Sequence, residues 1–160
     1  MAMESDDQKQ PCQLISALSV TVDQNYRGKN IPQQLILALK EYAEQQGYLG
    51  VVVPVRPTLK HLYPLQKFED YITWVNDQLE PFDAWIRTHW RLGAKIIKIA
   101  PKSMTITHSV AGWYEWTGLQ FPQNGYYVIP FGLVPLKIDI MRDIGCYVEP
   151  NVWMFHSADK

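Results

Sequence analysis

The first third of the chain alternates between apolar runs and polar interruptions. Residues 14–22 are rich in apolar and β-branched side chains, which predicts a strand. A polar loop follows over residues 23–30, and Pro32 then stands where the first turn of a helix should begin. Apolar residues next recur at spacings of three and four, which indicates a helix with one buried face ending at Gly47. Residues 48–55 form a second apolar run and predict a strand parallel to the first.

The remainder of the chain is divided by Gly and Pro into shorter elements. Helices are predicted over residues 56–63, 68–78, 81–91 and 110–116. Strands are predicted over residues 94–99, 126–130, 136–140 and 147–156. The chain is therefore expected to be an α/β protein, in which a mixed sheet is flanked by helices.

Length and composition favour one globular domain. The chain has 160 residues, of which 47% are hydrophobic and 19% charged. We expect residues 14–156 to form the domain, with a disordered tail over residues 1–13 and a short polar tail over residues 157–160. Cys12 and Cys146 lack metal-like spacing and are interpreted as unpaired thiols of a reducing compartment.

Charge and hydropathy narrow the range of partners. A formal net charge of −1 without a basic cluster argues against a nucleic-acid binder. The longest apolar run is too short to span a bilayer, and the N-terminus lacks the layout of a signal peptide. We therefore predict a cytoplasmic protein that binds neither nucleic acid nor membrane.

The polar loop before the first long helix has the features of an anion site. A helix N-terminus presents unpaired N–H groups and the positive end of the helix dipole. Gly28 permits close approach of a phosphate, and Arg27 and Lys29 add positive charge. The alternative is a tight turn whose basic side chains are merely solvated.

The run VTVDQNYRGKNIPQQLILALKEYAEQQG resembles the central motif of GNAT acetyltransferases, in which a strand, a pyrophosphate loop and a helix hold acyl-CoA. Gly28 matches the first glycine of the family loop, while Asn25 and Asn30 stand where the family has Gln or Arg and Gly or Ala. The resemblance implies acetyl-CoA or malonyl-CoA as cofactor. It also implies which residues bind it: the backbones of Val20 and Val22 would hold the pantetheine arm, and Arg27, Gly28, Lys29, Asn30 and Ile31 the pyrophosphate.

Later motifs, among them WYEWTG, GYYVIPFGLVP and YVEPNVWMFH, are similar to the GNAT-like loading domains of bacterial polyketide synthases. Those domains decarboxylate malonyl-CoA and pass the acyl group to a carrier-protein thiol, using a His and a Thr for which His156 and Thr117 are the candidates here. His156 and a hydroxyl would hydrogen-bond the enolate oxygen and return a proton. In amine acetylation His156 would act as a base. The alternative for His156 is a packed histidine of the last strand.

The other histidines give no site by sequence alone. His89 and Arg87 lie two apart on a predicted helix and so point to different faces, while His61 and His108 are isolated. No Asp, Glu or Cys stands at ligand spacing near them, so no metal site is predicted.

The resemblance also implies that the first strands of the fold are absent, because a complete GNAT domain places about three strands before the one predicted at residues 14–22. A partner subunit or a second copy would then cover the open edge of the sheet. Two functions follow as alternatives: an acyltransferase whose acceptor is an amine or a carrier-protein thiol, and a non-catalytic half-domain that binds CoA or a partner.

Overall fold

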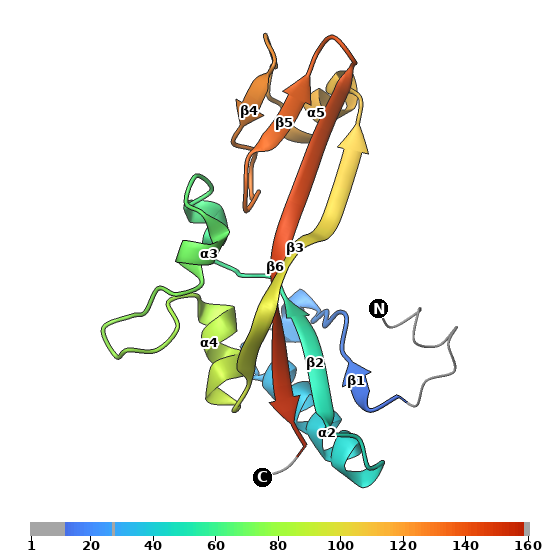
Figure 1. Ribbon diagram of the computed structural model, residues 1–160, viewed down its shortest axis with the longest axis vertical. Helices are drawn as coiled ribbons and strands as arrows, with labels where there is room; N and C mark the ends of the chain where they lie inside the picture. Colours follow the sequence, from blue (N-terminus) through green and yellow to red (C-terminus); the bar gives the residue numbers. More distant parts are fainter. Residues whose placement is uncertain (1–11, 27, 159–160) are drawn as a thin grey trace. The chain divides into compact units, whose positions relative to one another are not determined.

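The computed structural model describes residues 12–26 and 28–158, and their elements form a mixed α/β chain (Figure 1). Most of the two predicted tails, residues 1–11 and 159–160, lies outside the described residues. The strands are β1 (Leu14–Ser16), β2 (Gly50–Val55), β3 (Lys95–His108), β4 (Gly125–Tyr127), β5 (Leu136–Asp139) and β6 (Ile144–Ser157). The helical segments are η1 (Gln24–Tyr26), α2 (Ile31–Gln45), η2 (Lys60–Leu62), α3 (Phe68–Tyr71), α4 (Ala84–Arg91) and α5 (Val110–Thr117). The predicted class, a mixed sheet with flanking helices, is confirmed.

The strands follow the order β1-β2-β6-β5-β4, with β3 also paired to β6. β1 and β2 are parallel, as the sequence predicts, whereas β2–β6, β5–β6 and β4–β5 are antiparallel. β1 pairs with Gly50–Val52 only, so Pro54 has no β1 residue opposite it and removes no hydrogen bond from that ladder. Pro54 therefore stands where β2 is an edge strand on that side, which is the position that a proline tolerates.

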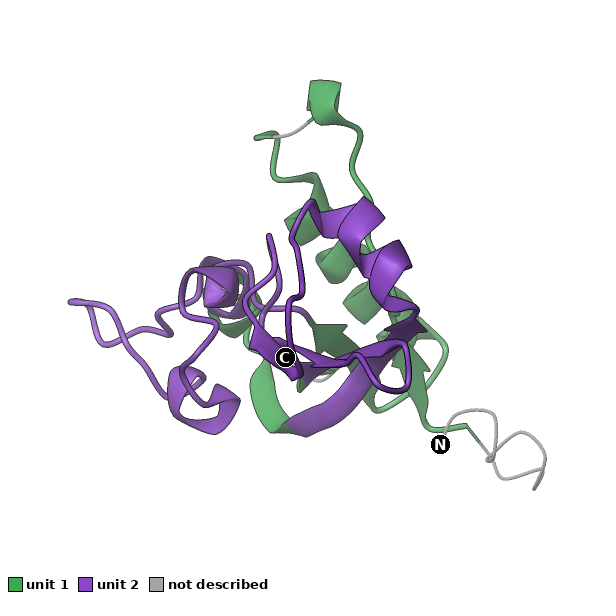
Figure 2. Ribbon diagram, turned by 90° about the horizontal axis from the view of Figure 1, so that it is seen from above, with its two compact units in different colours: residues 1–55, 88–98, 152–160 green, residues 56–87, 99–151 purple. Residues whose placement is uncertain are grey.

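The chain divides into two compact units, coloured separately in Figure 2. Unit 1 comprises residues 1–55, 88–98 and 152–160, and unit 2 comprises residues 56–87 and 99–151. β3 and β6 each contribute residues to both units, because each strand continues from one into the other. The unit 1 core contains Ala43 and Val51, and the unit 2 core is built around Trp113, Leu136 and Ile138.

Helix α2 has the limits that its sequence pattern predicts. Its buried stripe includes Ile36 and Ala43, which are 3% and 0% exposed. It stops at Gly47, whose φ of 74° is the left-handed geometry that closes many helices. The N–H groups of Gly47 and Tyr48 donate to the carbonyls of Glu44 and Ala43, at 3.1 and 2.8 Å, so two carbonyls of the last turn have acceptor roles outside the regular helical pattern.

The strand predicted over residues 14–22 is wrong beyond Ser16. The last bond to β2 runs from Ala17 N to Val52 O at 3.0 Å, and Leu18 is 73% exposed. Val20 and Val22 are therefore irregular backbone, because β-branched side chains favour a strand only where a partner strand is available.

Three helices predicted after Val55 are also shorter than expected. Of residues 56–63, only Lys60–Leu62 is helical, and the helix predicted over residues 68–78 ends at Tyr71. Asn76 accounts for the second limit, because its Oδ1 accepts from the N–H groups of two later residues and so forms a turn. The third helix begins at Ala84 rather than at a proline, since Asp83 accepts from its first N–H groups.

Two strands are longer than predicted, and one helix matches closely. β3 continues to His108 and β6 begins at Ile144, so each has 14 residues. α5 agrees with the helix predicted over residues 110–116 to within one residue. Within residues 12–26 and 28–158, no helix is long and apolar enough to cross a membrane.

Candidate functional site

The loop before α2 presents backbone donors. Gly28 and Asn30 have φ values of 79° and 56°, so the chain turns sharply as it enters the helix. Asn30 makes no side-chain cap, and the first helical bond is Gln34 N to Asn30 O at 3.1 Å. The N–H groups of Ile31 and Gln33 thus have no acceptor within the helix, which is what an anion site requires.

The described side chains around this loop include one cation and one buried acceptor. Lys29 Nζ lies 4.9 Å from the centre of the Tyr26 ring, and Gly28 has no atom within 4 Å of where a Cβ would stand. Arg27, the other predicted cation, lies outside the described residues. At the start of α2, the buried Gln33 Oε1 is an acceptor without a partner. The loop therefore offers donors on its backbone, a cation, and one unsatisfied acceptor.

In unit 1, strand pairing connects β1, which precedes this loop in the chain, to β6, which contains His156. Val51 pairs with Ile15 of β1 on one side and with His156 of β6 on the other. β1 separates from β2 after Ala17, and the segment that contains Val20 and Val22 follows. The predicted cofactor residues and His156 thus belong to one compact unit.

His156 is joined to a residue that the sequence analysis did not select. His156 Nε2 lies 2.9 Å from Nδ1 of His89, which comes from α4. The two rings are tilted by 55°, and their residues are 0% and 2% exposed. No local pattern could have found this pair, because its members are 67 positions apart.

Both imidazoles are held neutral. Burial, and secondarily the neighbouring His156, lowers the pKa of His89 to about 4. Burial also lowers the pKa of His156 to about 4, with a further contribution from the charge of Lys40, while the Leu92 carbonyl acts in the opposite direction. At pH 7 neither ring carries a charge, so the pair is suited to donating and accepting hydrogen bonds rather than to holding a positive charge.

Thr117 belongs to unit 2 and has a bonded hydroxyl. Its Oγ1 donates to Trp113 O at 2.7 Å and accepts from Leu119 N at 3.2 Å, which closes the end of α5. The structure therefore groups His156 with the cofactor loop but places Thr117 in the other unit.

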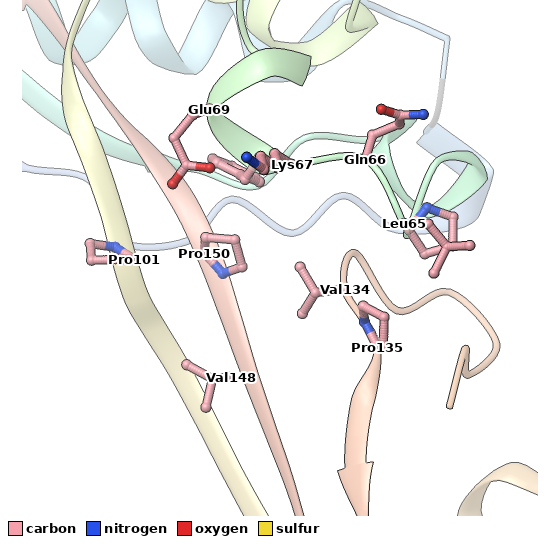
Figure 3. A pocket seen from close by; sticks show the side chains of 11 residues that line it. Leu65, Gln66, Lys67, Glu69, Pro101, Val134, Pro135, Val148 and Pro150 are labelled. Carbon is pink, nitrogen blue, oxygen red and sulfur yellow. The ribbon is translucent and has the colours of Figure 1, made fainter. Parts of the chain in front are cut away.

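A groove in unit 2 is separate from every predicted site residue. Its volume is about 380 Å³, and Figure 3 shows Lys67 and Glu69 beside its prolines. The prolines that line it are Pro64, Pro101, Pro135 and Pro150. Since proline has no N–H, this wall offers few donors to a polar ligand. Among the residues that the structure describes, no group of three or more His, Cys, Asp or Glu is arranged to hold a metal ion.

Comparisons with known proteins agree with the resemblance seen in the sequence. The chain is 34% identical over 166 residues to the arginine N-acetyltransferase avaD of Aspergillus versicolor, an alignment that covers 92% of this chain and 57% of that protein. Among solved structures it is similar to the loading GNATL domain of CurA from Lyngbya majuscula, with a TM-score of 0.59 and 16% identity, over 97% of this chain and 61% of that one. No protein-family model matches the chain.

These likenesses confirm the resemblance to GNAT-type acyltransferases and show a GNAT-like fold. The chain spans about three fifths of the length of both proteins that it matches.

Proposed function

We propose that this chain binds acyl-CoA and carries out acyl transfer from it, with an amine as the acceptor. The observation that carries the proposal is the 34% identity, over 92% of the chain, to a protein named an arginine N-acetyltransferase. The cofactor would lie against the backbones of Val20 and Val22, with its pyrophosphate at residues 27–31. The geometry that supports this placement is the turn at Gly28 and Asn30, followed by N–H groups that have no acceptor within α2.

His156 would act in the proposed reaction as a neutral hydrogen-bond donor. A group whose pKa is about 4 is a weak base near pH 7. A neutral imidazole can nevertheless donate to an oxygen on which negative charge develops, as in other enzymes whose catalytic histidine is held uncharged. This role serves both the tetrahedral oxyanion of amine acylation and the enolate of malonyl decarboxylation.

Thr117 stays a predicted catalytic group. Its hydroxyl is bonded on both sides, so it would have to release Trp113 O or Leu119 N before meeting a substrate. His156 is the stronger candidate because its Nδ1 has no partner among the described groups.

A second candidate function is binding of CoA or a partner protein without catalysis. The observation that favours it is the burial of His156, which is 0% exposed and so must be uncovered before any substrate reaches it. In that case the imidazole pair is a packed element of unit 1, and the loop alone is functional.

Ligand binding is tested first, by thermal unfolding with CoA, acetyl-CoA and malonyl-CoA. A ligand at 100 times its Kd adds about 2.7 kcal/mol of stability. Gly28→Trp should abolish the shift because the new side chain occupies the loop. Gly47→Trp is the matched control: its φ of 74° is close to the 79° of Gly28, and a Cβ added at either glycine would meet no atom within 4 Å. The proposed cofactor site at this loop would be rejected if both variants lost the thermal shift equally, or if the natural chain showed no shift with any of the three ligands.

Turnover then separates the two candidates. Release of free CoA thiol is followed with arginine, other amines or a carrier-protein thiol as acceptor, and carbon dioxide release is followed with malonyl-CoA. Amine-dependent thiol release supports the main proposal, and decarboxylation with transfer to the carrier thiol supports a loading reaction. Ligand binding with neither activity supports the non-catalytic module.

A further inference from the structure

The side chain of Gln33, in the first turn of α2, contains a buried atom that the chain itself leaves unbonded. Its Oε1 is buried and has no hydrogen-bond partner among the described residues. Asn151 and His156 are the other two described residues with such a side-chain atom. Atoms of this kind are rare in folded proteins, because an unpaired buried acceptor lowers stability. A bound group that donates to Gln33 Oε1 would remove this cost.

The conformation of Asn30 explains why this oxygen is unpaired. Asn30 and Gln33 have the residue types and the spacing of a capping box, in which the side chain of the later residue accepts from the N–H of the earlier one. An N-cap residue normally has extended backbone angles, whereas Asn30 has a left-handed φ of 56° and makes no side-chain cap. Neither hydrogen bond of the box is formed, so Gln33 Oε1 lacks its usual partner.

Gln33 begins the face of α2 that is directed at the sheet of unit 1. Ile36 and Ala43 follow it on the same helix face, and Ala43 packs in the core of unit 1. In a strand–helix–strand unit the first turn of the helix lies near the carboxyl ends of the parallel strands. At that end β1 leaves β2, since their last bond runs from Ala17 N to Val52 O. Gln33 thus lies over the end of the sheet at which these two strands separate.

The edge of β2 offers an acceptor at this end of the sheet. Val52 O points toward β1, and carbonyl directions alternate along a strand, so Pro54 O points to the same side. No β1 residue stands opposite Pro54, which has no N–H of its own. A ligand between α2 and β2 would therefore meet oxygen atoms that require N–H or O–H donors. The phosphates of CoA are acceptors, whereas its pantetheine arm has amide N–H groups and a hydroxyl.

We propose that Gln33 is a specificity-determining residue whose Oε1 accepts a hydrogen bond from an amide N–H of the pantetheine arm of acyl-CoA. This inference rests on the proposed function, which lays that arm against Val20 and Val22. Helical side chains lean toward the N-terminus of their helix, where the positive end of the dipole favours the amide oxygen over its NH₂ group. The chain would then distinguish CoA from nucleotides that have the same phosphates without the arm.

The affinities of two ligands test this contact by calorimetry. One is CoA, and the other is 3′-phospho-ADP, which has the adenosine and the phosphates of CoA but no pantetheine arm. Gln33→Met keeps the length of the side chain and removes the acceptor. We expect it to raise the Kd of CoA about 3- to 10-fold and to leave the Kd of 3′-phospho-ADP unchanged. An unchanged Kd of CoA, or an equal rise for both ligands, would overturn the inference.

Gln34→Met is the matched control. Gln34 is the next residue of α2, it is exposed, and its amide donates to Lys29 O at 3.5 Å. This substitution should change the Kd of neither ligand. A loss of CoA affinity as large as that of Gln33→Met would make the effect a general one of the first turn, and would contradict a specific contact at Gln33.

Thermal unfolding without ligand separates recognition from packing. Because Gln33 Oε1 is buried and unpaired, Gln33→Met should raise the Tm of the ligand-free chain by about 2–4 °C even though it weakens CoA binding. A residue whose role is to hold the fold would lower both quantities. A lower Tm in Gln33→Met would show that the amide is bonded within the chain, and the inference would then be wrong.

Failure of this inference and failure of the proposed function give different results. If the natural chain binds neither CoA nor 3′-phospho-ADP, the proposed cofactor site is rejected and the role of Gln33 with it. If the natural chain and Gln33→Met bind CoA equally well, the cofactor site stands and only the contact with Gln33 is rejected.

Discussion

The two units of the chain bury polar groups in different ways. In unit 2, both oxygens of the buried Glu149 are bonded: Arg56 donates to them at 2.8 and 2.9 Å, and Tyr147 OH donates at 2.6 Å. The Tyr147 oxygen in turn accepts from Leu133 N at 2.8 Å. Burial and the bond to Glu149 raise the pKa of Tyr147, so its proton stays in place. Each member of this network has its partners.

The imidazole pair of unit 1 is incomplete by comparison. Its two rings bond each other, yet His156 Nδ1 is buried without a partner. A buried polar network in which every group is hydrogen-bonded stabilises one structure. A buried polar group without a hydrogen-bond partner lowers stability, so its presence calls for an explanation other than packing. Both clusters are buried, so burial does not distinguish them. The Glu149 network, whose polar atoms are hydrogen-bonded, is interpreted as structural, whereas the pair that leaves His156 Nδ1 without a partner is the candidate site.

The largest expected change in stability is at the hydrogen-bond network of Glu149 in unit 2. Glu149→Leu should lower the free energy of unfolding by about 3–4 kcal/mol, because it leaves the buried Tyr147 hydroxyl and the half-exposed Arg56 without their acceptor. Urea unfolding measures the change. Arg142→Ala is the control, since that side chain is 83% exposed and lies 3.8 Å from Asp139, a geometry worth at most about 1 kcal/mol. Similar losses in the two variants would contradict the structural role of Glu149.

The next effect is the pH dependence contributed by the imidazole pair. An unfolded histidine titrates near pH 6.5, whereas the folded rings have a lowered pKa of about 4, so the unfolded state binds more protons between these values. The stability of the pair is therefore complete above about pH 6.5 and is lost as the pH falls towards 4. We expect a loss on the order of 3 kcal/mol for the coupled pair.

This dependence is measured by unfolding at several pH values in the natural chain and in His156→Leu, whose slope below pH 6.5 should be smaller. Lys40 is a charged group beside the pair, and its positive charge contributes to the lowered pKa of His156. Identical slopes in the two proteins would show that His156 binds protons equally in the folded and unfolded states, which would contradict its lowered pKa.

A smaller effect is expected at Lys60, which is 0% exposed and donates to Tyr63 O and Leu133 O at 2.6 and 2.8 Å. Burial lowers its pKa. Lys60→Met preserves the length of the side chain but leaves two carbonyls without this donor, at a cost of about 2 kcal/mol. Lys67→Met, on an exposed side chain, should change stability by less than about 0.5 kcal/mol. A Lys60→Met protein as stable as its control would make Lys60 dispensable to unit 2.

The smallest effect concerns Thr117. Thr117→Val removes the acceptor of Leu119 N and should cost about 1 kcal/mol of stability. Activity per folded molecule is the second measurement: a fall of more than about 100-fold would assign the hydroxyl a catalytic role, whereas full activity would limit it to the end of α5. Thr117→Ser, which keeps the hydroxyl, is the matched variant.

Local patterns in the sequence predicted an element correctly where the residues that begin and end it lie within the element or next to it. α2 was predicted because its apolar spacing, Pro32 and Gly47 all act within a few turns, and the loop before it was predicted because Gly28 has a local conformational role. The parallel pairing of β1 with β2 followed from the helix between them. The resemblance to GNAT-type acyltransferases likewise rests on consecutive residues.

Tertiary structure decided what depends on partners distant in sequence. Residues 17–22 have strand-like side chains, yet they are irregular because pairing with β2 ends at Ala17. His89 was predicted to form no site with its neighbour Arg87, and only the tertiary structure brings its Nδ1 within 2.9 Å of Nε2 of His156. Both outcomes have one physical reason: a hydrogen bond or a shifted pKa depends on which groups are close in space, and spacing along the chain specifies this only within an element.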